Sequence, residues 1–201
     1  DAFAVISRKK YPQMYKNEVS SSNPAPLSDG EHVYWTCGGG MKGPGAHVLA
    51  CFDLDGRRVW SKHDSSFGSL EHGNHCSPNL IDGKLIYAAN MTLVAYDAKT
   101  GEELWRNSPD DWQNGGHGSS SPLAVRIGDA GAIVSMRYIH RAADGTVICP
   151  SRLELWGVLT PIIENDVVFN PCRWHGFDTP VGFIGVKLPA NVRAGAKAEI
   201  I

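Results

Sequence analysis

The feature that most constrains the fold is an internal repeat. Residues 27–60 and 80–105 align with each other, and in each copy an Asp-Gly turn is followed by an apolar run. Each copy closes on a second turn whose glycine stands four residues before a tryptophan, Trp60 in one copy and Trp105 in the other. Because a turn, a run and a tryptophan rarely share one spacing by chance, the chain is built from repeated supersecondary units.

Two further copies follow. The third begins at Ser121-Pro122, 44 residues after Ser77-Pro78, and it lacks the closing tryptophan. The fourth starts at Thr160-Pro161 and is expected to be unfinished. The expected divisions are residues 1–20 as a lead-in or the end of a preceding unit, 21–62, 63–107 and 108–150 as three units, and 151–201 as a fourth, incomplete unit.

Within one unit the pattern predicts four short strands, over residues 76–81, 84–89, 92–97 and 103–107. Asp-Gly and Thr-Gly between them supply the positive-φ residue that tight hairpins need. The apolar stretches are runs instead of strict alternations, which indicates sheets covered on both faces. Four-stranded antiparallel sheets at a period of about 40 to 45 residues describe the blades of a β-propeller or a solenoid, and we favour the propeller. The predicted fold class is all-β, an incomplete ring of about three and a half blades.

The pattern Ala-x-Asp-x-x-Thr-Gly-x-x-x-Trp over residues 95–105 resembles the repeat of the PQQ-like (quinoprotein-type) β-propellers. Residues 50–60 match the same pattern with one residue deleted before Gly56. In that family the tryptophan of the outer strand docks against the neighbouring blade. The resemblance also implies a periplasmic or extracellular location, and a partial propeller that the remaining blades of a longer chain or another copy would complete. It implies a structural docking role for Trp60, Trp105, Gly56 and Gly101.

Composition excludes several classes of protein. Apolar residues make up 42% and charged residues 20% of the chain, which is typical of a soluble globular protein and of neither a disordered nor a membrane-spanning one. The net charge is −2 and no long Lys/Arg run occurs, so nucleic acid is not an expected partner. Five cysteines without a Cys-x-x-Cys pair disfavour a zinc ribbon and a c-type haem. Buried thiols are favoured over a bond between Cys37 and Cys51 across a hairpin.

Few motifs indicate catalysis. The glycine-rich segment 38–43 satisfies G-x-G-x-x-G, but no helix follows to receive a pyrophosphate, so a hairpin loop is favoured. The serine run 119–121 has no neighbouring group in its motif that would activate a nucleophile. Asp53 and Asp97 stand next to turn glycines, where a carboxylate accepts hydrogen bonds from the turn's own amides, so a structural role is favoured over acid–base catalysis.

The histidines are more informative. In a meandering blade the connections between blades and the hairpins between second and third strands emerge on one face, because strand direction alternates. His63, placed in a connection, and His47, placed in such a hairpin, are both expected there. Imidazoles converging at this face could bind a metal, with His72, His75 and His117 as candidates, although packing and loop fixation are favoured. The candidate ligand face comprises His72, His75, His117, His175, Trp112 and Trp174.

We therefore expect a non-catalytic propeller scaffold whose His/Trp-rich loop face binds a protein, a saccharide or a small ligand, with no cofactor. An alternative is a fragment of a quinoprotein dehydrogenase-like oxidoreductase that uses PQQ and calcium. Those enzymes commonly carry an adjacent Cys-Cys pair, which this sequence lacks, so the resemblance favours transfer of the fold without the redox activity. A third possibility, by fold analogy alone, is assistance in outer-membrane protein insertion.

Overall fold

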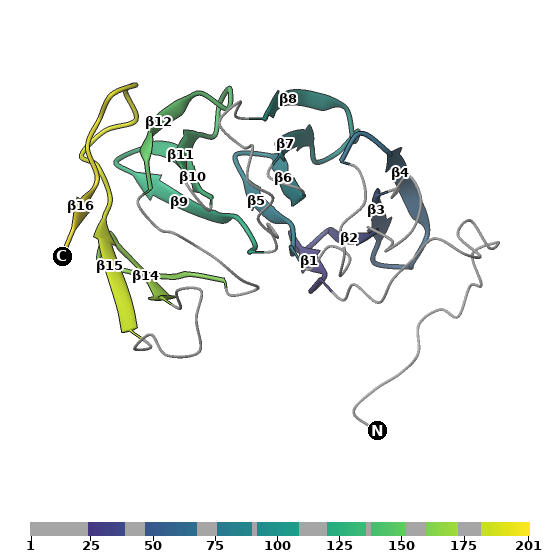
Figure 1. Cartoon of the computed structure of the whole chain (residues 1–201). Helices are drawn as coiled ribbons and strands as arrows, with labels where there is room; N and C mark the ends of the chain where they lie inside the picture. The colour runs from purple at the N-terminus through teal and green to yellow at the C-terminus, as the bar shows by residue number, and fades with distance from the viewer. Residues whose placement is uncertain are drawn as a thin grey trace. The chain divides into compact units, whose positions relative to one another are not determined.

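All regular elements that the structure describes are β-strands, as expected. The computed structural model describes residues 24–38, 47–67, 76–89, 92–108, 120–135, 138–151, 160–172 and 182–201. The strands form four separate four-stranded antiparallel sheets, each a meander of consecutive strands (Figure 1). We call these sheets blades 1 to 4. In the part of the chain described, no helix has the length and apolar character needed to cross a membrane.

Each blade takes four consecutive strands. The chain divides into two compact units, residues 1–74 with blade 1 and residues 75–201 with blades 2, 3 and 4. Blade 1 contains β1 (Leu27–Ser28), β2 (His32–Gly38), β3 (His47–Asp53) and β4 (Arg58–Asp64). Blade 2 contains β5 (Asn79–Ile81), β6 (Lys84–Ala89), β7 (Thr92–Asp97) and β8 (Glu103–Asn107). Blade 3 contains β9 (Leu123–Ile127), β10 (Ala130–Val134), β11 (Tyr138–Arg141) and β12 (Val147–Pro150). Blade 4 contains β13 (Ile162–Glu164), β14 (Val167–Cys172), β15 (Gly182–Lys187) and β16 (Glu199–Ile200).

Blade 2 agrees with the predicted strands except at its first strand. The bounds of β6, β7 and β8 are those predicted, whereas β5 begins at Asn79 and not at residue 76. The reason lies in the next blade: the amide of Ser77 donates to Ser121 Oγ at 2.9 Å, and the Cys76 thiol donates to the carbonyl of Ser120 at 3.2 Å. These groups bond to blade 3, so they do not extend the ladder with β6.

One turn geometry closes the third strand of each of the first three blades. In blade 2 the amide of Gly101 donates to the carbonyl of Asp97 at 2.8 Å, and in blade 3 the amide of Gly145 donates to the carbonyl of Arg141 at 2.9 Å. Blade 1 has the same turn with one residue fewer, between Asp53 and Gly56, which confirms the deletion inferred from the repeat. The three turn glycines have φ values of 71, 73 and 75°, a backbone region that favours glycine.

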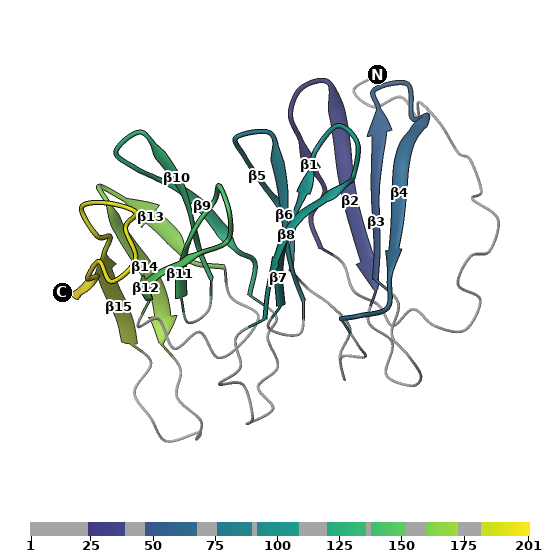
Figure 2. The same ribbon diagram turned by 90° about the horizontal axis from the view of Figure 1, so that it is seen from above.

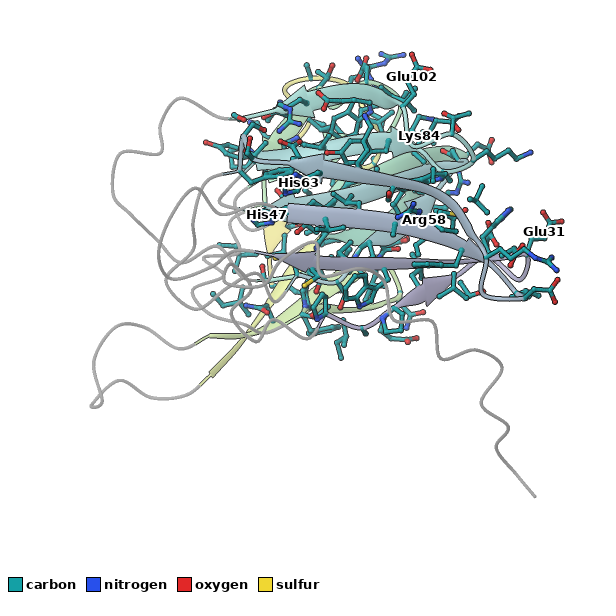
Figure 3. All side chains as sticks on the ribbon, turned by 90° about the vertical axis from the view of Figure 1, so that its right-hand side faces the viewer. Glu31, His47, Arg58, His63, Lys84 and Glu102 are labelled. Atoms are coloured by element: carbon teal, nitrogen blue, oxygen red, sulfur yellow. The ribbon has the colours of Figure 1, made fainter. Side chains whose placement is uncertain are left out.

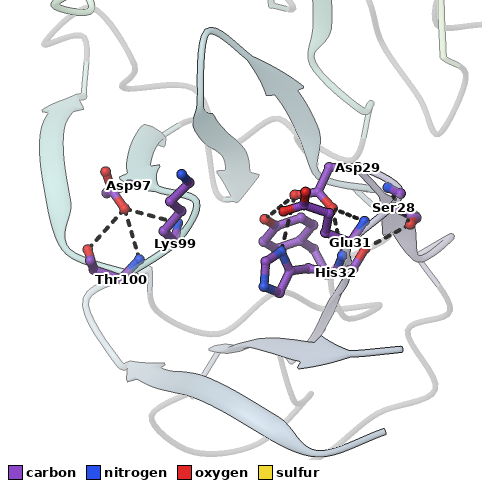
Figure 4. Close-up of polar contacts among 9 residues, drawn as sticks. Ser28, Asp29, Glu31, His32, Asp97, Lys99 and Thr100 are labelled. Carbon is purple, nitrogen blue, oxygen red and sulfur yellow. Dashed lines mark hydrogen bonds and ion pairs between the residues drawn. The ribbon is translucent and has the colours of Figure 1, made fainter. Parts of the chain in front are cut away.

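The turn carboxylates have the expected structural role. Asp97 Oδ1 accepts hydrogen bonds from the amides of Lys99 and Thr100 at 2.9 and 2.8 Å, as Figure 4 shows. These bonds, led by that from the Thr100 amide, lower the pKa of Asp97. Asp53 Oδ1 likewise accepts from the amide of Arg57 at 2.7 Å. Both aspartates therefore stabilise their turns, as the sequence predicted.

Blades 2 and 3 pack face to face through a seam (Figure 2) that repeats the 44-residue offset of the sequence. The Trp105 indole Nε1 donates to the carbonyl of Ala142 at 3.1 Å, and Asn107 Nδ2 donates to the carbonyl of Gly145 at 3.1 Å. The Arg126 guanidinium pairs with the Asp82 carboxylate across the same seam. Its apolar centre consists of Ile81, Ile86, Leu93 and Ala95 from blade 2 and Ile133 and Ala142 from blade 3.

Among the described residues, no tryptophan contributes to the seam between blades 3 and 4. The register places Cys149 opposite Ile139, where blade 2 has Trp105 opposite Ala95. Residues 188–198 of blade 4 supply apolar side chains instead, including Leu188 and Ala198, and the amide of Gly195 donates to the carbonyl of Ile148 at 2.9 Å. A long turn on one blade thus compensates for a small residue on the other.

The fourth copy differs from the expectation of an unfinished unit. After residues 188–198 the chain returns to pair Ile200 with Val186, which adds β16 and completes a four-stranded sheet. The repeat pattern missed this strand because the turn between β15 and β16 is much longer than in the other copies and carries no Thr-Gly signal.

Cys37, Cys51, Cys76 and Cys149 are buried thiols that form no disulfide. Cys37 lies opposite Val48 and Cys51 lies opposite Tyr34, so the alternative in which they face each other is wrong. Burial raises the pKa of Cys76 to about 12, which keeps this thiol neutral at physiological pH.

Candidate functional site

The candidate face is defined by the direction of the strands. In each blade the second strand ends, the third begins and the fourth ends at the same end of the sheet, which we call the loop end. Figure 3 shows this for blade 1, where His47 and His63 lie at one end of their strands and Glu31 and Arg58 lie toward the other. At the opposite end, the turn end, are the short hairpins described above.

The six residues predicted for the ligand face lie outside the described residues. In the sequence they follow strands that run toward the loop end: β4 before residues 72 and 75, β8 before residues 112 and 117, and β14 before residues 174 and 175. The strand directions are therefore consistent with the prediction that these segments lie at the loop end, but the positions of their side chains remain predictions. They are His72, His75, Trp112, His117, Trp174 and His175.

Two other histidines of that face are placed differently from the prediction. His47 is the first residue of β3 and not a hairpin residue; it is fully buried, and its ring lies 5.0 Å from that of Phe67. His63 belongs to β4 and not to a connection between blades, and it pairs with Val48. In blade 1, β2, β3 and β4 extend over seven residues each, so they incorporate positions that the shorter repeat assigned to loops.

Two hydroxyl groups near the loop end are buried. Thr36 on β2 and Ser120, just before β9, are 1% and 4% exposed, and their oxygens have no hydrogen-bond partner among the described residues. A buried hydroxyl usually has a partner, so each is a place where water or a bound group could be accommodated.

Blade 3 contains a polar network that the sequence did not reveal. His140 is 2% exposed, and its Nδ1 lies 3.2 Å from the carbonyl oxygen of Gly145 while its Nε2 lies 3.1 Å from Ser135 Oγ. Burial lowers the pKa of His140, although the bond to Gly145 opposes this. The sequence did contain a signal. The third strand of each of the first three blades has a β-bulge, and the residue after it is Phe52 in blade 1, Tyr96 in blade 2 and His140 in blade 3. A histidine therefore stands where the other copies have Phe or Tyr.

A second polar cluster lies at the turn end of blade 1. Asp29 accepts hydrogen bonds from the amides of Glu31 and His32 at 2.8 and 2.6 Å and from the Tyr34 hydroxyl at 2.8 Å. Burial disfavours the charge, but these bonds outweigh it and lower the pKa of Asp29 to about 2. Figure 4 shows the carboxylate inside its loop. The cluster organises the β1–β2 connection.

Replacing Asp29 with asparagine is expected to lower the Tm by about 3 °C near neutral pH, since a loss of about 1 kcal/mol shifts Tm by that order in a chain of this size. The contribution of a carboxylate with a depressed pKa is present above its unfolded value of 3.8 and is lost as pH falls toward 2. The difference between wild type and Asp29→Asn should therefore shrink over that range, measured by thermal unfolding. Asp55→Asn is the control, because Asp55 bonds only the exposed side chain of Arg57, and an equal effect of both changes would contradict the account.

Comparison with known proteins decides the family. The sequence matches the family model described as "Outer membrane protein assembly factor BamB", one of the PQQ-like repeat models, over residues 9–169. That is more than half of the chain. The chain belongs to the PQQ-like repeat family. No curated protein matches the sequence.

Several solved structures are similar to the chain. BamB from Moraxella catarrhalis is 20% identical, with a TM-score of 0.46, over 73% of this chain and 39% of that one. A europium-containing methanol dehydrogenase is 17% identical, with a TM-score of 0.50, over 67% of this chain and 25% of that one. The computationally designed Ika4 protein is 13% identical, with a TM-score of 0.47, over 84% of this chain and 98% of that one. The chain thus spans well under two thirds of the two natural proteins, and identities this low show the fold alone.

The four sheets are accordingly β-propeller blades of the PQQ-like type, and the predicted fold class is confirmed. Asp53 and Asp97 accept hydrogen bonds from backbone amides of their turns, and the Trp105 indole donates to the carbonyl of Ala142 in the neighbouring blade. Trp60 on blade 1 lies 6.3 Å from the Tyr34 ring, measured between ring centroids.

Proposed function

We propose that the chain is a non-catalytic PQQ-like scaffold that docks protein partners, first of all another propeller blade. The observation that carries this proposal is the outer face of blade 4. Ile162 and Ile201 are 67% and 65% exposed there, whereas the apolar side chains between blades 2 and 3 and between blades 3 and 4 are buried or partly buried. Exposed apolar side chains gathered on one sheet face mark an interaction surface.

The register supports this assignment. In blade 2 Ile86 lies opposite Ala95, which lies opposite Trp105, and this row faces blade 3. In blade 4 the equivalent row is Phe169 opposite Gly185, whose carbonyl accepts from the amide of Ile201. The row that binds the next blade in one copy is therefore present in the last copy, where Phe169 is half-buried and Ile162, its partner on β13, is exposed together with Ile201. A further blade, from a longer chain or from another copy, fits this face.

Association in solution tests the proposal. At micromolar concentration the chain is expected to elute from a sizing column above its 21.8 kDa mass, because the exposed row associates. The double variant Ile162→Lys/Ile201→Lys should shift elution toward the monomer. Leu104→Lys is the matched control, since Leu104 is 46% exposed on blade 2 and lies outside this row, and it should leave elution unchanged. A compact wild-type monomer, or equal effects of both substitutions, would contradict the proposal.

The loop end is proposed as a second surface, for a protein, saccharide or small ligand. It rests on the six His and Trp residues of the ligand face and on the strand directions that bring their segments to one end. Loop fixation is favoured over metal binding for His72, His75 and His117. Zinc titration followed by His resonances should therefore leave these signals in place, and saturable shifts at them would establish a metal site instead.

A quinoprotein dehydrogenase-like activity is the alternative, and the described residues do not fit PQQ and calcium. The carboxylates of Asp29, Asp53 and Asp97 are engaged by turn amides, and among the described residues no three His, Cys, Asp or Glu side chains gather as a metal site. Adding PQQ and calcium should produce no dye reduction with simple alcohols. Clear turnover would overturn the scaffold proposal.

An extracytoplasmic location, which the family resemblance favours, is part of the same proposal.

A further inference from the structure

His140 lies inside the seam between blades 2 and 3. Its cross-strand partner is Ile133, and directly paired residues of antiparallel strands project from the same face of the sheet. Ile133 belongs to the apolar cluster shared with Ile86 and Ala95 of blade 2. The imidazole, 2% exposed, therefore occupies the buried side of blade 3 that contacts blade 2.

Both ring nitrogens face hydrogen-bond acceptors. The carbonyl of Gly145, 3.2 Å from Nδ1, can only accept, so Nδ1 carries a proton. Ser135 Oγ, 3.1 Å from Nε2, donates to the carbonyl of Tyr138 at 3.0 Å. In the neutral ring the Ser135 hydroxyl proton can turn from Tyr138 to Nε2, which then accepts it. In the imidazolium Nε2 donates to Ser135 Oγ, whose proton turns to Tyr138. The network thus accommodates a second proton geometrically, but no carboxylate among the described residues bonds the ring to balance the charge.

The nearby charged groups are already engaged with each other. Arg141 and Asp144 on the adjoining turn form an ion pair at 2.6 Å, and Glu103 and Arg106 on β8 form another at 2.7 Å. The other titratable or charged side chains on the described seam strands and the adjoining turn are Lys84, Tyr87, Tyr96, Asp97, Glu103, Arg106, Arg126, Tyr138, Arg141, Asp144 and Cys149. The acids among them are engaged, since Asp97 accepts from turn amides, Glu103 pairs with Arg106 and Asp144 pairs with Arg141. A charge on the buried ring would therefore lack a compensating partner among the described residues, and such a charge is costly.

The network is connected to blade 2 through a single carbonyl. The oxygen of Gly145 that faces His140 Nδ1 also accepts from Asn107 Nδ2 on β8 at 3.1 Å. The Cα of Gly145 lies directly against the Trp105 indole, where an added Cβ would be 2.6 Å from the ring. A change in the hydrogen bond between His140 and this carbonyl therefore affects the residue through which blade 3 contacts Asn107 and Trp105 of blade 2.

We propose that His140 is an acid-sensitive latch: the neutral ring holds the seam between blades 2 and 3 closed, and protonation of the ring on acidification loosens it. Burial lowers the pKa of His140 in the folded chain below its unfolded value of about 6.5. A histidine with a depressed pKa contributes stability that is fully present above the unfolded value. That contribution declines as pH falls from there to the folded value, by up to about tenfold in the unfolding equilibrium constant per pH unit.

Hydrogen exchange of the full chain at pH 7.5 and 5.5, corrected for intrinsic rates, tests the latch. The amide of Ser77 and the indole N–H of Trp105, which both donate across the seam, should lose protection at pH 5.5 in the wild type. The variant His140→Phe places in blade 3 the residue that blade 1 carries as Phe52, and it should show no such pH dependence. His63→Gln removes an exposed histidine and should retain it. Equal wild-type protection at both pH values, or a pH dependence that persists in His140→Phe, would overturn the proposal.

A second measurement keeps the proposal testable if His140→Phe does not fold. Titration of the wild-type imidazole resonances should give His140 a midpoint below the ordinary histidine value of about 6.5. Loss of seam protection should begin near pH 6.5 and level off below the His140 midpoint. An ordinary midpoint for His140 with an intact seam, or a seam that opens independently of this titration, would exclude the latch.

Discussion

Replacing Gly145 with alanine is expected to destabilise the packing of blades 2 and 3 by about 3 kcal/mol or more. An added Cβ would lie 2.6 Å from Cε3 and 2.9 Å from Cδ2 of Trp105, distances that side chains do not tolerate. The backbone adds to the cost, since Gly145 has a φ of 73°, where a residue with a Cβ is strained by about 1 kcal/mol. Denaturant unfolding followed by tryptophan fluorescence measures the loss.

Gly128→Ala separates the two contributions. Gly128 lies on the same blade with a φ of 58°, and nothing lies within 4 Å of its added Cβ, so only the backbone strain of about 1 kcal/mol applies. We expect Gly145→Ala to cost at least twice as much as Gly128→Ala. Equal costs would show that the indole does not pack on Gly145.

Truncating Trp105 to alanine is the second change with a large expected effect. The indole fills the seam beside Ala142 and Gly145 and donates to the Ala142 carbonyl, so its removal leaves a cavity and an unsatisfied acceptor. A loss of about 3 to 5 kcal/mol is typical of such a truncation. Leu104→Ala on the same strand is the control, because Leu104 is 46% exposed, and it should cost about 1 kcal/mol or less. Similar losses from both changes would argue against the seam.

The variant Trp105→Phe separates the contribution of the indole hydrogen bond from that of the ring packing. Phenylalanine keeps most of the ring contact with blade 3 but cannot donate to the Ala142 carbonyl, so we expect a loss of about 1 to 2 kcal/mol, between the control and the alanine variant. A loss as large as that of Trp105→Ala would place the stabilisation in the hydrogen bond and not in the packing.

The turns and strands of the best-conserved copies were predictable because their determinants are local. Asp-Gly and Thr-Gly fix the hairpins, and the strand bounds of residues 84–107 follow from them. The deletion before Gly56 was also predictable, since it leaves the turn glycine and the tryptophan in place. In each case one short segment contains both the signal and the structure it specifies.

The features that were missed depend on contacts between copies. The start of β5 at Asn79 follows from bonds of Ser77 to Ser121 in the next blade, 44 residues away. The replacement of a tryptophan by Cys149 is visible in the sequence, but the long turn of residues 188–198 that compensates for it is not, because the turn lacks the repeat's spacing. His140 was overlooked for a related reason: its partners are identified only once β10, β11 and the adjoining turn lie together.

The candidate site was predictable only in outline. Alternating strand direction correctly indicates which ends of the strands lie together, whereas the strand lengths of blade 1 moved His47 and His63 out of the loops. Repeat spacing therefore assigns segments to an end of a blade more reliably than it assigns single side chains to a surface.

The most direct test of the stacked-blade account is a double-mutant cycle between Trp105 and Gly145. Unfolding free energies of the wild type, Trp105→Ala, Gly145→Ala and the double variant are compared. If the indole rests on Gly145, removing it relieves the contact at 2.6 Å, so Gly145→Ala should cost only its backbone strain of about 1 kcal/mol in the Trp105→Ala background. Additive costs would contradict the docking of one blade on the next through this tryptophan.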